Sequence, residues 1–140
     1  MTERVPVGLI QEAGISNRKP LGNEDWIRTG IIRQAQTLDA TPVPVYVKAL
    51  KDDEAFNIKV TGRAFEVATG DTQFKMEVGG VNQTGGTAAI VGTPTVVDLS
   101  EDAGAAAWDI TITVATDEVI VSVVGEAAHV IDWTVRVELT

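Results

Sequence analysis

The chain contains no cysteine and a single histidine, His129. Without cysteine there is no disulfide, no thiolate metal ligand and no cysteine nucleophile. One histidine cannot supply the two or more imidazoles that many metal sites need within a subunit. These absences exclude disulfide scaffolds, cysteine enzymes and histidine-rich metal centres.

Long apolar runs and basic side chains are also scarce. No run approaches the roughly 18 residues of a membrane-spanning helix, and residues 1–4 lack the apolar region of a secretory signal. We therefore expect a soluble protein made in a cytoplasm, without membrane insertion. Residues 1–36 carry five basic and four acidic side chains, whereas residues 37–140 carry six and sixteen. Because an acidic body repels phosphate backbones, nucleic acid is not an expected partner.

The first thirty residues lack hydrophobic periodicity and are interrupted repeatedly by glycine and proline. Asn23 is a candidate cap for a short helix, but we favour an extended arm, residues 1–30, ahead of a domain at 31–140. Thirty residues without elements are unusual inside a compact domain, so we expect the arm to dock on a partner. Its expected partner-binding residues are Trp26, Ile27, Ile31 and Ile32, although folding back of Trp26 onto the body is an equal alternative.

From residue 31 onward, short segments of alternating apolar and polar residues are separated by turn signals. This pattern, without a long amphipathic helix, predicts an all-β fold: an antiparallel, jelly-roll-like β-sandwich of about eight strands. The expected strands are 31–37, 43–50, 56–67, 74–78, 87–99, 108–114, 119–124 and 131–139.

The alternation also predicts local features of these strands. The apolar phase of Phe56, Ile58 and Val60 shifts by one at Phe65, which predicts a β-bulge near Gly62–Ala64. Two other strands are expected to place these residues on shared faces: Val43, Val45 and Val47; and Phe74, Met76 and Val78, with Lys75 and Glu77 facing the other way.

Residues 119–124 are apolar on both faces, which is typical of a strand that is central in its sheet or faces another subunit. Val119, Val121 and Val123 are therefore candidate subunit-interface residues. Trp108 and Trp133 alternate with polar neighbours, which favours packing in the core.

Side chains capable of chemistry show no recognisable motif, and we predict no catalytic residue. His129 is expected to make an ordinary hydrogen bond at a turn or strand end. Acidic residues stand beside turns at 52–54, 101–102 and 117–118, where solvation is the main interpretation. Calcium binding there is chemically feasible but lacks an EF-hand pattern. The glycine pairs at 79–80 and 85–86 lack the lysine of a phosphate-binding loop.

Seven short segments, in this order and spacing, resemble the small β-sandwich domain found at the C-termini of tail-fibre and related virion appendage proteins of tailed bacteriophages. The resemblance covers residues 36–139. The segments are 36–42, 61–64, 70–71, 91–93, 107–109, 121–125 and 131–135.

The resemblance implies a structural or binding module of a virion that is usually a homotrimer, with no cofactor and no catalysis. Only a short leader precedes the domain here, rather than a shaft or coiled coil. That difference favours a small separate virion component, either a capsid decoration protein or a short head or tail fibre, bound to capsid or tail proteins. The alternative is a tail-fibre tip that contacts a host-surface receptor through loops at 79–87 or 100–107.

Overall fold

The computed structural model describes residues 30–140, which form eight strands and one short 3-10 turn, η1 (Ala103–Ala105). Every strand pairing is antiparallel. The predicted all-β sandwich is therefore confirmed. The strands are β1 (Ile31–Thr37), β2 (Val43–Ala49), β3 (Ala55–Phe65), β4 (Thr72–Thr84), β5 (Thr87–Glu101), β6 (Asp109–Ala115), β7 (Glu118–Val124) and β8 (Ile131–Leu139).

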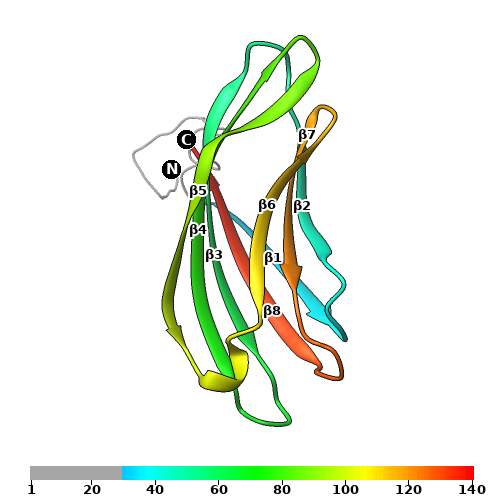
Figure 1. Ribbon diagram of the computed structural model, residues 1–140, viewed down its shortest axis with the longest axis vertical. Coiled ribbons are helices and arrows are strands. Elements are labelled where there is room, and N and C mark those ends of the chain that lie inside the picture. The colour runs from blue at the N-terminus through cyan, green and yellow to red at the C-terminus, as the bar shows by residue number, and fades with distance from the viewer. Residues whose placement is uncertain (1–29) are drawn as a thin grey trace, which may run out of the picture.

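The strands form two facing layers (Figure 1). One sheet has five strands in the order β1-β8-β3-β4-β5, and the other has three in the order β2-β7-β6. Because three strands face five, the free edge of β6 lies against β4 and β5 rather than against another edge. The backbone polar groups at this free edge of β6 therefore need hydrogen-bond partners inside the sandwich.

The core lies between the sheets and is built mainly from alternating residues of β3, β6, β7 and β8. Trp108 and Trp133 are both buried, which confirms their predicted packing role. The Trp133 indole N–H donates to the Thr37 hydroxyl over 2.9 Å, and the Trp108 N–H donates to Glu126 over 3.1 Å. Each indole ring is thus buried, and its N–H, the only hydrogen-bond donor of the side chain, has an acceptor.

β7 is the central strand of the three-stranded sheet. Val119, Val121 and Val123 are fully buried in the core, so their assignment to a subunit interface is corrected. The prediction that this strand, apolar on both faces, is central in its sheet is confirmed. Within residues 30–140, no helix is long and apolar enough to cross a membrane.

The bulge predicted near Gly62–Ala64 is absent, because β3 keeps a continuous register with both β4 and β8. Gly62 and Ala64 stay on the inner face, and Phe65 points outward. A Cβ at Gly62 would overlap Ile110 Cδ1. The apparent phase shift therefore comes from small inward residues that make room for a large neighbour.

A bulge occurs instead in β2, between Pro44 and Tyr46. It separates the valines that the sequence places on one face. Val43 pairs with the inward Val123, whereas Val47 pairs with Ile120 and is 49% exposed. Tyr46 and Lys48 take the inward positions instead, beside Val121 and Val119.

Candidate functional site

Two of the predicted partner-binding residues, Trp26 and Ile27, lie outside the described residues. Ile31 and Ile32 belong to β1, and this corrects their assignment to the arm. Ile31 pairs with Val137, and its side chain is buried. Ile32 points to the opposite face and is 55% exposed, so of these two only Ile32 is accessible to a partner.

A cleft of about 530 Å³ lies between β2, the start of β3 and the end of β8. β1 begins at Ile31, opposite Val137, so the end of β8 that carries Leu139 has no strand paired with it on that side. The cleft lies at this corner of the sandwich, where Phe56 is half-buried and Leu139 is 8% exposed. The size is that of a site for one aromatic side chain or a small ligand.

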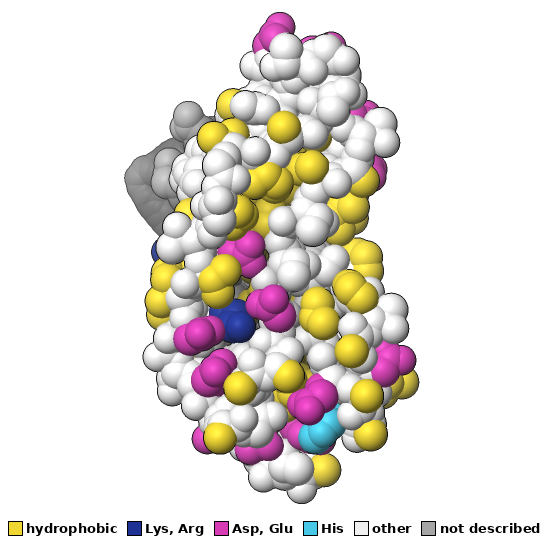
Figure 2. All heavy atoms as spheres, viewed as in Figure 1, with side chains coloured by type: hydrophobic (Ala, Val, Ile, Leu, Met, Phe, Trp, Pro, Cys, Tyr) yellow, Lys and Arg dark blue, Asp and Glu magenta, His cyan; other side chains and the backbone are white. Residues whose placement is uncertain are grey.

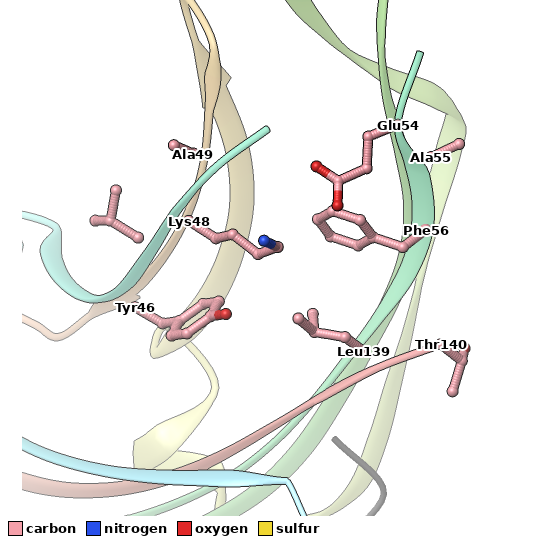
Figure 3. Close-up of a pocket in the computed structure, with 9 residues that line it drawn as sticks. Tyr46, Lys48, Ala49, Glu54, Ala55, Phe56, Leu139 and Thr140 are labelled. Carbon is pink, nitrogen blue, oxygen red and sulfur yellow. The ribbon is translucent and has the colours of Figure 1, made fainter. Parts of the chain in front are cut away.

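Four side chains point into this cleft from two layers: Tyr46 and Lys48 from β2, Phe56 from β3 and Leu139 from β8 (Figure 3). The Lys48 ammonium lies 5.6 Å from the centroid of the Phe56 ring, within cation–π range. Burial raises the pKa of Tyr46. Glu54 adds a carboxylate at the rim. The cleft thus presents apolar walls and one charge of each sign, which suits binding rather than acid–base chemistry.

A second polar cluster occupies the seam where β4 faces the edge of β6. The alternation predicted for β4 is present, but Gln73, Lys75 and Glu77 are the buried set and Phe74 is 42% exposed. The Gln73 amide donates to the carbonyls of Ala105 and Trp108, both over 2.9 Å. Long polar side chains of β4 therefore satisfy backbone groups at and just before the start of β6, and inward charges of this kind block edge pairing.

Lys75 is the cation of this seam. Its ammonium lies 3.1 Å from the Trp108 carbonyl, 3.3 Å from Asp98 and 3.4 Å from Asp109. Burial alone would lower the pKa of Lys75, but the carboxylates of Asp109 and Asp98 outweigh it, so the pKa is raised and the side chain stays charged. Figure 2 shows acidic side chains gathered around a basic patch on the visible face.

Glu77 lies next along β4 from Lys75. Burial, with a smaller contribution from the charge of Asp109, raises the pKa of Glu77 to about 7. A hydrogen bond from the Ile112 backbone and the charge of Lys75 act in the opposite direction. The seam is therefore a structural network whose charge changes near neutral pH.

His129, in the turn between β7 and β8, pairs with the buried Glu66 in the turn between β3 and β4. Its Nδ1 lies 2.8 and 2.9 Å from the two carboxylate oxygens. This hydrogen bond raises the pKa of His129 and lowers that of Glu66. Thr69 also donates to Glu66, over 3.0 Å. The predicted ordinary hydrogen bond at a turn is confirmed.

The acidic turns hold loops in place. Asp52 accepts the Gly86 N–H over 2.6 Å and the Gln83 amide over 3.2 Å, which ties two turns together. Among residues 30–140 no three acidic or histidine side chains are placed to hold a metal ion.

Of the two loops suggested for receptor contact, residues 79–87 are mostly strand, whereas residues 100–107 are mostly η1 and turn. Residues 79–87 comprise the end of β4, the turn at Gly85–Gly86 and the start of β5. Residues 100–107 comprise the end of β5 and η1. The sequence carries no signal for the cleft, because its walls come from three strands that only the fold brings together.

Comparison with known proteins gives only distant likenesses. No family model matches the chain. No curated protein matches it either. Among solved structures, the tailspike protein of Acinetobacter phage vB_ApiP_P1 has 18% identity and a TM-score of 0.47, with 94% of this chain and 25% of that one covered.

Two other tailspikes are similar to smaller parts of the chain. Tailspike gp49 of Acinetobacter baumannii phage Fri1, a capsular polysaccharide depolymerase, has 14% identity and a TM-score of 0.41, with 78% and 17% covered. The tailspike of phage AM24 has 10% identity and a TM-score of 0.36, with 79% and 28% covered. The chain thus spans between 17% and 28% of these proteins' lengths.

Proposed function

We propose that this chain is a non-enzymatic structural protein of a bacteriophage virion, a small surface decoration or short-fibre component that its leader, residues 1–30, anchors to the particle. The resemblance of residues 36–139 to virion appendage domains supports the class of protein. The proposed partners are capsid or tail proteins and two further copies in a homotrimer.

One structural observation carries the non-enzymatic role. The side chains most capable of chemistry, Lys75, Glu77, Glu66 and His129, are held by fixed contacts inside the sandwich or at its turns. In the described chain these side chains form hydrogen bonds or ion pairs at a strand edge or in a loop. They do not converge on the cleft. A rigid β body of this kind is suited to displaying a surface and tethering it.

The test removes residues 1–29 and leaves Gly30 and the whole body. We expect the truncated protein to keep its β-sheet circular dichroism and to be lost from purified particles. The body-surface variant Lys59→Ala, with the leader intact, is the matched control and should incorporate normally. Incorporation of the truncated protein at full occupancy would refute anchoring by the leader.

The receptor-binding alternative predicts a different partner. A decoration protein should bind particles that lack it, whereas a receptor-binding tip should bind host cells. Light scattering of the purified protein tests the trimer, for which a mass of three chains is expected.

A further inference from the structure

The open corner of the sandwich lies beside the point where the leader joins the body. Gly30 packs against β8, because a Cβ at this position would lie within about 3.1 Å of the Glu138 side chain and the Val137 carbonyl. Leu139 and Thr140, the next residues of β8, line the cleft. The leader therefore meets the body within one or two residue pairs of the cavity.

Residues 24–28 of the leader read Glu-Asp-Trp-Ile-Arg. They place the bulky apolar pair Trp26-Ile27 between two acidic residues and one basic residue. The cleft presents the complementary set: apolar walls from Tyr46, Phe56 and Leu139, the cation of Lys48 and the carboxylate of Glu54. Lys48 forms no salt bridge with a carboxylate of residues 30–140.

The connection is long enough for this segment to reach the cleft. Three residues lie between Trp26 and Gly30, and the four steps from one Cα atom to the next span at most about 14 Å. Gly30 has a φ of 81°, a left-handed conformation that glycine adopts readily and that turns the chain away from the line of β1. A tether this short gives an effective concentration of roughly millimolar, so a contact of modest intrinsic affinity is mostly formed.

We infer that residues 24–28 dock in this cleft of their own chain, with the Trp26 indole against Phe56 and Leu139 and the acidic pair near Lys48. Docking covers the corner that β1 leaves open. It also sets the direction in which residues 1–23 leave the body, and these then remain for contact with a partner. This inference is independent of the proposed virion role, because it concerns the isolated protein.

The absence of cysteine allows a direct test by disulfide trapping. Ile27→Cys is combined with Ala49→Cys or with Thr140→Cys, which lie on two sides of the cleft. The matched control combines Ile27→Cys with Ala89→Cys on β5, where the side chain is also exposed. We expect at least one cleft pair to oxidise within a monomer about tenfold faster than the control, because a disulfide needs Cα atoms about 4.4–6.8 Å apart.

Tryptophan fluorescence supplies a second measurement on the unlinked protein. Trp108 and Trp133 are buried, so the difference between the native protein and Trp26→Phe reports Trp26. We expect this signal to be shielded from acrylamide. Phe56→Ala should lower the docking equilibrium constant about tenfold, the loss expected for one aromatic contact. Phe65→Ala, the same change on the outer face of the same strand, should leave it unchanged.

The outcomes separate the occupants of the cleft. Crosslinks between chains, with shielding that rises with concentration, would identify a second copy and overturn docking within the chain. Equal oxidation rates for all pairs, with Trp26 as accessible as in a free peptide, would mean that the purified protein leaves the cleft to another partner. Neither result would decide whether the protein joins a virion.

Discussion

β8 and β4 are both interior strands of the same sheet, and both alternate apolar and polar residues, yet they bury opposite kinds of side chain. β8 buries Ile131, Trp133 and Val135, whereas β4 buries Lys75 and Glu77. β8 faces the apolar inner side of the smaller sheet, whereas β4 faces the free edge of β6. The comparison shows that the groups opposite a strand decide which of its faces is buried.

Trp133→Ala should have the largest effect, because it empties a packed site on β8 and removes the donor to Thr37. We expect a loss of about 3–5 kcal/mol in the free energy of unfolding, measured by urea titration. Trp133→Phe should lose clearly less, because most of the ring volume remains. A loss below about 1 kcal/mol for the alanine variant would contradict the packed β8 face.

Lys75→Ala tests the polar interior of β4. It leaves Asp98 and Asp109 without their cation and removes one donor to the Trp108 carbonyl. Because both carboxylates are about half exposed, we expect a loss of about 2 kcal/mol rather than the larger loss of a fully buried pair. Lys59→Ala, an exposed lysine with a 3.9 Å contact to Glu138, should change stability by less than about 0.5 kcal/mol.

Glu77→Gln tests the charge in the seam. A folded pKa near 7, above the ordinary 4.5, means that the folded state binds a proton more tightly, so stability falls as pH rises from about 4.5 to about 7. The variant should remove the part of this fall that Glu77 contributes, and it should keep the fall above pH 6.5 that the raised pKa of His129 contributes. At pH 8 it should be more stable than the native protein by about 1–2 kcal/mol, less than the full shift implies because the seam is partly open to water.

The measurement is urea unfolding at pH 5 and pH 8. Glu118→Gln at the start of β7 is the matched control and should leave the pH profile unchanged. A native profile that rises or stays flat from pH 5 to pH 8, or that falls as far in Glu77→Gln as in the native protein, would show that Glu77 is not the group responsible.

Phe74→Ser should have the smallest effect and is the sharpest contrast with Lys75→Ala. The neighbouring residues lie on opposite faces of β4, and the aromatic ring is the exposed one. We expect a change of less than about 1 kcal/mol in the free energy of unfolding. A loss larger than that of Lys75→Ala would reverse the assigned faces of the strand.

Much of the strand order was predictable because turns and alternation are local properties. β1 has the predicted bounds, and the central place of β7 follows from its apolar residues on both faces. The faces of β2 and β3 were not predictable in the same way. Tyr46 and Lys48 point inward because of a bulge at the preceding residues, and Gly62 lies inside because Ile110 fills the space beside it.

The candidate site was predictable only in part. Trp26 stands out in the sequence as an aromatic residue in an unpatterned leader. The cleft does not, because Tyr46, Phe56 and Leu139 lie in three different strands and Leu139 is far from the other two along the chain. The His129 contact was predicted as a kind of interaction, while its partner Glu66 required the fold.

The amino-acid sequence by itself determines that this protein forms antiparallel strands, carries an acidic body and lacks thiol chemistry, since these depend on side-chain type and short-range spacing. The tertiary structure decides which side of each strand is covered. The local sequence of an alternating strand does not decide which of its two faces is buried. The sheet that packs against one face makes that face the interior. A five-stranded layer packed on a three-stranded one therefore places charged residues inside β4 and leaves one corner open beside the leader.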